Sequence, residues 1–103
     1  MSKIYLSGPI SSLPLEAARR AFKQAEATLQ AQGWEVVNPL DNGLPVDAPW
    51  EQHLAEDVLQ MLTCKAVYML RGWENSQGAR LEYALAQRVK MRVIFETQMT
   101  EKE

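Results

Sequence analysis

Short apolar runs alternate with amphipathic stretches along the whole chain. Three stretches, residues 15–32, 50–62 and 76–90, repeat apolar side chains at the spacing of one helix face. The runs before, between and after them are rich in β-branched and aromatic residues, which is typical of strands. These runs are KIYLSG, WEVVNP, AVYML and MRVIFE. The pattern therefore predicts the order β-α-β-α-β-α-β.

Such regular alternation favours a parallel sheet with helices on both faces, and right-handed crossovers restrict its topology. We predict an α/β fold, a flavodoxin- or Rossmann-like three-layer sandwich with a four-stranded parallel sheet in the order 2-1-3-4. The ligand crevice of such a sheet lies at the carboxyl ends of strands 1 and 3, where the strand order reverses. The loops SGPISS and RGWENSQG would meet there.

Composition narrows the function classes. The 103 residues suit one small domain, which we place at residues 1–96, followed by a frayed polar tail at residues 97–103. A net charge of −2 offers no basic surface for a nucleic-acid polymer. One cysteine and one histidine argue against a disulfide framework and a structural zinc site. Without a run of transmembrane length or a signal-peptide pattern, we expect a cytoplasmic protein that does not bind membranes.

The size of the sheet predicts self-association. A four-stranded domain buries little apolar surface by itself, and Trp34, Trp50 and Trp73 lie near loops or strand starts. Aromatic side chains are enriched at protein interfaces, so we expect a homo-oligomer, either a dimer or a multiple of one. The alternative is that the tryptophans close the core of a monomer.

The stretch RGWENSQGARLEYALAQ places a carboxylate near the beginning of a helix. Helical side chains lean toward the N-terminus, so Glu82 leans over Gly78, which has no side chain. The result would be a carboxylate with a vacant slot before it, opening toward the crevice. An exposed glutamate, or one paired with Arg80 or Arg88, also explains this spacing.

Other polar side chains are predicted near the same crevice. Tyr5 and Ser7 face the same side of the first strand, and a tyrosine hydroxyl there can orient a carboxylate or donate to a leaving group. A half-buried sheet tyrosine is the alternative. In the following loop, Gly8 and Ser11 offer a backbone N–H and a hydroxyl that suit a hydroxylated or phosphorylated ligand.

The second helix carries a carboxylate beside its apolar face. Asp57 adjoins Leu54 and Met61 at the edge of the apolar stripe, so it is either a surface flank or a partner in the crevice. We expect His53 at the surface and Cys64 as a small packed residue.

Together, KIYLSGPIS, PWEQHLAEDVLQMLTC and GWENSQGARLEYALA resemble the nucleoside 2-deoxyribosyltransferase superfamily. The resemblance runs from residue 3 to about residue 95. It is closest to a branch of small proteins, often encoded by phages or prophages, with the pattern YLSGPI…GW..S.GA..E...A. The characterised branches are deoxyribosyltransferases and deoxynucleoside 5′-monophosphate N-glycosidases. The resemblance therefore implies a hydrolase or transferase that acts on the N-glycosidic bond of a small-molecule nucleoside or nucleotide.

The resemblance also implies roles for single residues. Glu82 matches the nucleophilic glutamate, Tyr5 matches a strand tyrosine held close to it, and Asp57 matches the aspartate that assists the base or proton transfer. The loop that lines the sugar pocket is matched by Gly8 and Ile10.

Ser76 occupies a position that differs between the two enzyme types. The transferases tend to carry aspartate there, whereas the nucleotide hydrolases carry a serine that contacts the phosphate, so this chain resembles the hydrolases. Ser76 would cap the helix and leave the N–H of Gly78 facing the crevice. With Ser7 and Ser11 opposite, the site would bind a 5′-phosphate or a 5′-hydroxyl.

Three features depart from the resemblance. The strand-1 loop reads PISS where the hydrolases carry an arginine, a loss for which Arg19 or Arg20 would have to compensate. Lys65 replaces an aspartate, and the chain ends soon after the fourth predicted strand, whereas the transferases borrow C-terminal groups from a neighbouring subunit. The choice between nucleoside and monophosphate, and the identity of the base, stay open.

The chemistry explains why a carboxylate would lie in the crevice. Cleavage of a deoxyribose–base bond passes through an oxocarbenium-like state at C1′, which a carboxylate can stabilise or trap as a glycosyl ester. This scheme needs Glu82 ionised and Asp57 able to carry a proton, and like-charge repulsion would separate their pKa values in that direction. No metal or organic cofactor is required. A non-catalytic nucleotide-binding module, a phage accessory protein and a structural subunit with a vestigial crevice are the alternatives.

Overall fold

Four parallel strands form the centre of the structure, a computed structural model that describes residues 2–101. They pair in the predicted order, β2-β1-β3-β4. Their bounds are β1 (Lys3–Ser7), β2 (Glu35–Val37), β3 (Ala66–Met69) and β4 (Arg92–Phe95). The predicted strands and their topology are therefore confirmed.

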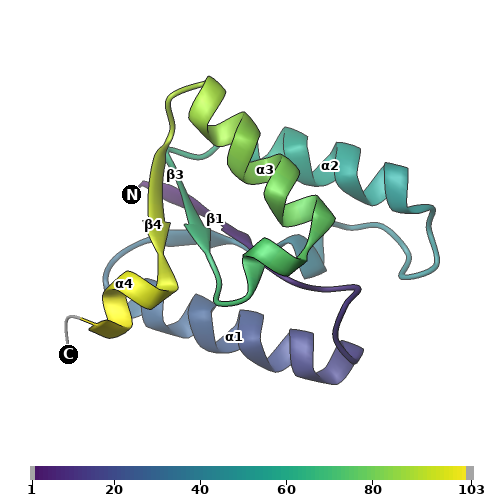
Figure 1. The fold of residues 1–103 in the computed structure, drawn as a ribbon, viewed down its shortest axis with the longest axis horizontal. Helices are drawn as coiled ribbons and strands as arrows, with labels where there is room; N and C mark the ends of the chain where they lie inside the picture. Colours follow the sequence, from purple (N-terminus) through teal and green to yellow (C-terminus); the bar gives the residue numbers. More distant parts are fainter. Residues whose placement is uncertain (1, 102–103) are drawn as a thin grey trace.

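Three long helices cover the two faces of the sheet. α1 (Leu15–Ala31) packs on one face, whereas α2 (Trp50–Leu62) and α3 (Gln77–Arg88) pack on the other (Figure 1). All three were predicted at nearly these bounds. Gly33 ends α1 as expected, because its φ of +94° lies in the left-handed region that favours glycine.

The alternation of side chains along β1 divides the core into two layers. Ile4 and Leu6 point toward α1, where they pack with Phe22 and Leu29. Tyr5 points to the opposite face, into the layer built by β3, α2 and α3. Since successive side chains of a strand alternate, Ser7 at the end of β1 faces the same side as Tyr5.

Two short helices lie in connections, and a third follows β4. They are η1 (Pro39–Asp41), η2 (Trp73–Asn75) and α4 (Glu96–Glu101). The frayed tail expected at residues 97–103 is corrected, because α4 is helical through residue 101. Residues 102–103 lie outside the described residues. The Glu96 carboxylate accepts a hydrogen bond of 2.6 Å from the backbone N–H of Arg71, which anchors the beginning of α4. Within residues 2–101, no helix is long and apolar enough to cross a membrane.

Candidate active site

A cavity of about 320 Å³ opens beside the carboxyl end of β1. Its walls come from β1 and the loop after it, the start of α1, the loop after β2, and the first turns of α2 and α3. The volume is within the range of small-molecule sites. Its position agrees with the reversal of strand order, since β1 is next to β3 in the sheet and the segment after β3 contributes Ser76 to the wall.

Close packing shapes the floor of this cavity at Gly8. A Cβ atom at this position would lie 2.7 Å from the Cβ of Leu70, the residue that follows β3. Glycine therefore lets the loop after β1 pass against the neighbouring strand.

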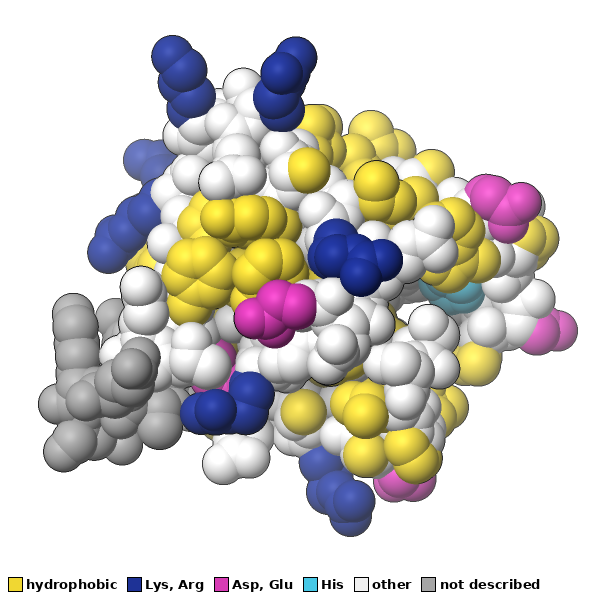
Figure 2. All heavy atoms as spheres, viewed as in Figure 1, with side chains coloured by type: hydrophobic (Ala, Val, Ile, Leu, Met, Phe, Trp, Pro, Cys, Tyr) yellow, Lys and Arg dark blue, Asp and Glu magenta, His cyan; other side chains and the backbone are white. Residues whose placement is uncertain are grey.

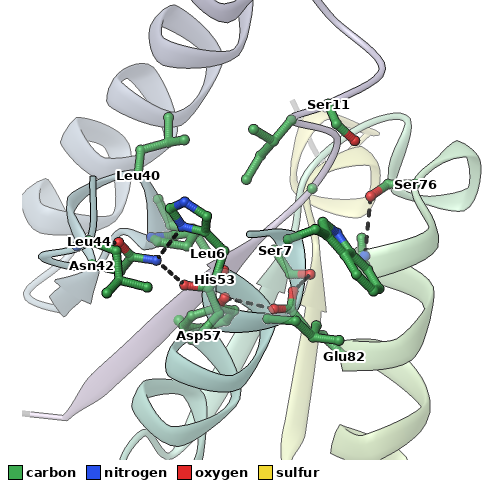
Figure 3. A pocket seen from close by; sticks show the side chains of 18 of the residues that line it. Leu6, Ser7, Ser11, Leu40, Asn42, Leu44, His53, Asp57, Ser76 and Glu82 are labelled. Atoms are coloured by element: carbon green, nitrogen blue, oxygen red, sulfur yellow. Dashed lines mark hydrogen bonds between the residues drawn. The ribbon is translucent and has the colours of Figure 1, made fainter. Parts of the chain in front are cut away.

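Glu82 is the most buried carboxylate of the cavity, with 6% of its surface exposed. The Tyr5 hydroxyl donates to its Oε2 at 2.8 Å, and the Ser7 hydroxyl donates to its Oε1 at 2.6 Å. Figure 3 shows Glu82 pointing toward Ser7 at the centre of the pocket. These bonds exclude the reading of Glu82 as an exposed residue, and its hydrogen-bond partners are hydroxyls of β1 instead of Arg80 or Arg88.

Burial favours the neutral form of Glu82, whereas its hydrogen bonds favour the charged form. Its pKa is raised from 4.5 to about 7, and burial is the largest cause. The hydrogen bonds from Ser7 and Tyr5 lower the pKa, and the charge of Asp57 raises it. Burial, followed by the charge of Glu82, holds the pKa of Tyr5 well above 10.0. Tyr5 therefore stays a neutral donor over the range in which Glu82 titrates.

Asp57 lies in the same cavity but in a separate hydrogen-bond network. Its side chain is 9% exposed, and burial raises its pKa, while the hydrogen bond from Asn42 lowers it. Asn42 donates from Nδ2 to Oδ1 of Asp57 at 3.0 Å. Asp57 is thus a buried partner in the crevice and is not a surface flank.

Burial, and not repulsion, is the main cause of the raised pKa values of the two carboxyls. We expected repulsion to leave Glu82 the more readily ionised of the pair. Instead, burial is the largest influence on both groups and brings the pKa of Glu82 to about 7. Burial outweighs repulsion here because desolvation penalises the charged form of each carboxyl individually.

His53 was expected at the surface, and the structure corrects this position. It is half-buried, lines the cavity, and lies with Nδ1 3.1 Å from Nδ2 of Asn42. Its Nε2 lies 3.0 Å from the carbonyl oxygen of Pro45. The sequence interpretation missed Asn42 altogether; the only signal was an asparagine before Gly43 in a loop that faces the crevice.

The first turn of α3 carries the predicted cap and the predicted slot. The Oγ of Ser76 accepts a hydrogen bond of 3.2 Å from the N–H of Ala79. A Cβ atom at Gly78 would have no neighbour within 4 Å, so the space in front of Glu82 is open. The vacant slot inferred from helical spacing is therefore present.

All residues predicted for the site line this one cavity. They are Tyr5, Ser7, Gly8, Ile10, Ser11, Asp57, Ser76, Gly78 and Glu82. In Figure 3, Ser11 and Ser76 lie on one side of the pocket, and Asn42, His53 and Asp57 lie on the other, with Ser7 and Glu82 between them. The structure thus places a hydroxyl-rich end and a carboxyl end on opposite sides of Glu82.

The cavity wall also has an apolar side that the sequence did not identify. Leu44, Val46 and Trp50 form an apolar side, and Val46 and Trp50 are 72% and 46% exposed. Of the two neighbouring arginines in the first turns of α1, Arg19 and Arg20, it is Arg19 that lines the cavity. Among residues 2–101, no group of three or more histidine, cysteine or acidic side chains is arranged to hold a metal ion.

Comparisons with known proteins identify a family but not an activity. A search of curated proteins finds no match to the chain. The model of one family, described as a domain of unknown function (DUF4406), matches residues 2–95. This match spans β1 through the last residue of β4, and with them every residue of the cavity wall. The chain therefore belongs to the DUF4406 family.

Proposed function

We propose that the protein cleaves the N-glycosidic bond of deoxynucleosides or deoxynucleoside 5′-monophosphates, with Glu82 as the nucleophile. One observation carries this proposal. A buried carboxylate is held by two hydroxyl donors, from Tyr5 and Ser7, and faces an open slot in a cavity of about 320 Å³. Such burial is unfavourable for a charge that has only a structural role, and perturbed carboxyls in a cleft are typical of catalytic sites. The resemblance to the deoxyribosyltransferase superfamily supports the same assignment.

The geometry suggests a two-step reaction. A Glu82 oxygen forms an ester bond to C1′ as the C1′–N bond breaks, and Asp57 transfers a proton to the departing base. Water, or a second base, then attacks C1′ and releases Glu82, with its proton passing to Asp57. The raised pKa of Asp57 supports its role as the proton carrier. Tyr5 and Ser7 orient the carboxylate through its two oxygens.

The proposal is tested with a panel of deoxynucleosides and their 5′-monophosphates. Release of free base is followed by chromatography, with and without a second base as acceptor, which separates hydrolase from transferase activity. We expect base release from at least one member of the panel. Binding measured by calorimetry without any base release would contradict the enzyme assignment and indicate a nucleotide-binding module.

Ser76 is expected to set the preference between phosphate and hydroxyl at the 5′ end. The first N–H groups of α3 and the partial positive charge of the helix favour an anion there, worth about 0.3–1 kcal/mol. Arg19 at the cavity wall adds a cation. We therefore expect a monophosphate to bind modestly better than its nucleoside, and Ser76→Asp to reverse this order, because a carboxylate repels phosphate and accepts from a hydroxyl.

Calorimetry of both proteins against paired ligands measures this reversal. Aspartate is as good an N-cap as serine, so the stability of α3 should be unchanged. Equal preferences before and after the substitution would mean that Ser76 only caps the helix.

Tyr5→Phe is expected to move the pH dependence of base release. The phenol stabilises the charged form of Glu82, so its loss raises the pKa of Glu82 above about 7. The rising limb of kcat/KM against pH should move upward by about one pH unit, the usual size for a hydrogen bond to a charged group. Tyr83→Phe is the control, because the Tyr83 hydroxyl contacts Gln87 outside the cavity. An unmoved limb in Tyr5→Phe would argue against Glu82 as the titrating group.

We also propose that the protein forms a homo-oligomer, a dimer or a multiple of one. Trp73 packs against Tyr83 and Phe95 with ring centroids 4.7 and 6.0 Å away, and all three side chains stay half-buried. Figure 2 shows hydrophobic side chains gathered on this face, between the edge strand β4 and α3. Trp34 is half-buried as well, but it lies on the opposite layer of the core, beside α1.

Sedimentation measures the oligomeric state directly. We expect a mass above the 11.7 kDa of one chain at micromolar concentration, and a lower mass for Trp73→Ala. Leu62→Ala, at an exposed position on α2, serves as the control. A wild-type protein that sediments as a monomer at high micromolar concentration would refute the proposal.

A further inference from the structure

Asn42 joins the loop after β2 to the carboxyl end of the cavity. Its side chain is 8% exposed. Both N–H groups of the amide, and one of the two acceptor positions of its oxygen, are engaged by other residues of the protein. Nδ2 lies 3.1 Å from Nδ1 of His53 and donates to Oδ1 of Asp57 at 3.0 Å. Oδ1 accepts from the N–H of Leu44 at 3.0 Å. With both N–H groups engaged, Asn42 acts on a ligand through its neighbours.

The partners of Asn42 fix the state of His53. A carbonyl oxygen can only accept, so the contact of 3.0 Å between Nε2 and Pro45 places a hydrogen on Nε2. Nδ1 is then the acceptor for the amide of Asn42. The backbone N–H of Leu44 requires the oxygen of Asn42 on its own side, so the amide orientation agrees with this assignment. The hydrogen bonds therefore assign Nε2 as the donor and Nδ1 as the acceptor of the His53 ring.

The same amide distinguishes the two oxygens of Asp57. Oδ1 accepts the N–H of Asn42, so a proton carried by Asp57 belongs on Oδ2. Asp57 lines the cavity, and Oδ2 is the oxygen that Asn42 leaves free for a ligand. Within α2, the charge of His53 lowers the pKa of Asp57 and that of Glu56 raises it. Across the cavity, the charge of Asp57 raises the pKa of Glu82 on α3 and of Tyr5 on β1.

We propose that Asn42 is a positioning residue, which holds Asp57 so that the oxygen available to the leaving base carries the proton. This role rests on the proposed function, since it assigns Asp57 to proton transfer. One N–H of Asn42 donates to Asp57. The second N–H contacts His53, and the amide oxygen accepts from Leu44 in the loop, so the Asn42 side chain is itself held in place.

The first test needs no substrate. The carboxyl carbon of Asp57 is titrated by NMR in carbon-labelled protein and assigned by its disappearance in Asp57→Asn. In Asn42→Ala, the charged form loses its amide donor, so the pKa of Asp57 should rise by about one pH unit. The chain has one histidine, so the Nδ1 resonance of His53 is unambiguous and should also move.

Asn38→Ala is the matched control. Asn38 is equally buried at 8%, lies in the same loop, and accepts from the N–H of Leu40 at 3.0 Å, as Asn42 does from Leu44. Its Nδ2 donates to Glu26, away from the cavity. Asn38→Ala should therefore leave the titration of Asp57 unchanged. An equal rise in both variants would show a general loosening of the loop and would overturn the proposal.

A second variant protects the test against loss of the fold. Asn42→Asp retains the acceptor for Leu44 and the side-chain volume but cannot donate as a carboxylate, so it should raise the pKa of Asp57 more than Asn42→Ala. An unchanged pKa of Asp57 in this variant would also overturn the proposal.

Kinetics separate this inference from the proposed function. If base is released, Asn42→Ala should lower kcat severalfold with little change in KM, and the falling limb of kcat against pH should move in the same direction as the pKa of Asp57. Base release with no movement of that limb would refute the role of Asn42 alone. No base release from any substrate would refute the proposed function, whereas the NMR titration would still decide whether Asn42 controls Asp57.

Discussion

Glu82→Gln is expected to lower the rate of base release at least about a thousandfold. Glutamine matches glutamate in shape but cannot form the ester to C1′ or balance the charge of the oxocarbenium-like state, and removal of a nucleophile has effects of this size or larger. The measurement is kcat/KM on the best substrate of the panel at pH 8, where Glu82 is mostly ionised because its pKa is about 7. Ligand binding should persist, since the cavity keeps its shape.

Two further variants make this result specific. Glu74→Gln removes an exposed glutamate shortly before α3 and should retain full activity. Glu82→Ala empties the site of the nucleophile, so added azide should restore base release and yield a glycosyl azide. Retention of a tenth or more of the wild-type rate in Glu82→Gln would exclude Glu82 as the nucleophile.

The fold was predictable from the sequence because each segment follows one period. The apolar strands β1 and β3 contain little polar surface and are buried on both faces, as strands at the centre of a parallel sheet must be. α1 has its buried positions at helical spacing, and Gly33 marks its end. The C-terminal segment was mispredicted, because its polar composition suggested a tail whereas a contact between Arg71 and Glu96 helps to order the beginning of α4.

Part of the site follows from the same periods. The alternation of β1 sends Tyr5 and Ser7 to one face, and the helical period of α3 brings Glu82 over Gly78 toward them. These relations hold in any parallel sheet of this order, because the carboxyl end of a strand and the beginning of the next helix are neighbours. The placement of the Glu82 carboxylate therefore required only the correct topology.

The Asn42 network was not predictable for a different reason. Its loop has no period, and its conformation depends on side-chain contacts with α2, 11 and 15 residues further along the chain, which no regular spacing predicts. A histidine on a polar helix face, such as His53, gives no sign that a loop will cover it. The pKa values of Glu82 and Asp57 were likewise inaccessible, since they depend mainly on burial and not on the identity of neighbouring charges.

Glu82 is also expected to destabilise the protein at alkaline pH. The stability of Glu82→Gln relative to wild type should therefore be greater at alkaline pH than in acid. The unfolded chain loses the Glu82 proton near pH 4.5, whereas the folded protein keeps it until about pH 7. Between these values the folded state binds more protons than the unfolded state, so the free energy of unfolding decreases as pH rises. Above pH 7 the stabilisation that protonated Glu82 provides in acid is lost, and this loss amounts to about 3 kcal/mol.

Denaturant unfolding at pH 4.5 and pH 8 tests this expectation, with tryptophan fluorescence as the signal. The difference in unfolding free energy, Glu82→Gln minus wild type, should be larger at pH 8 by about 3 kcal/mol, a substantial part of the 5–15 kcal/mol that stabilises a typical domain. The difference isolates Glu82 because the other titrating groups, Asp57 among them, are present in both proteins. Glu74→Gln should show no such dependence, since its glutamate is exposed in the folded state as well. A pH-independent difference for Glu82→Gln would mean that Glu82 titrates near its ordinary pKa, and that the hydroxyls of Tyr5 and Ser7 compensate fully for its burial.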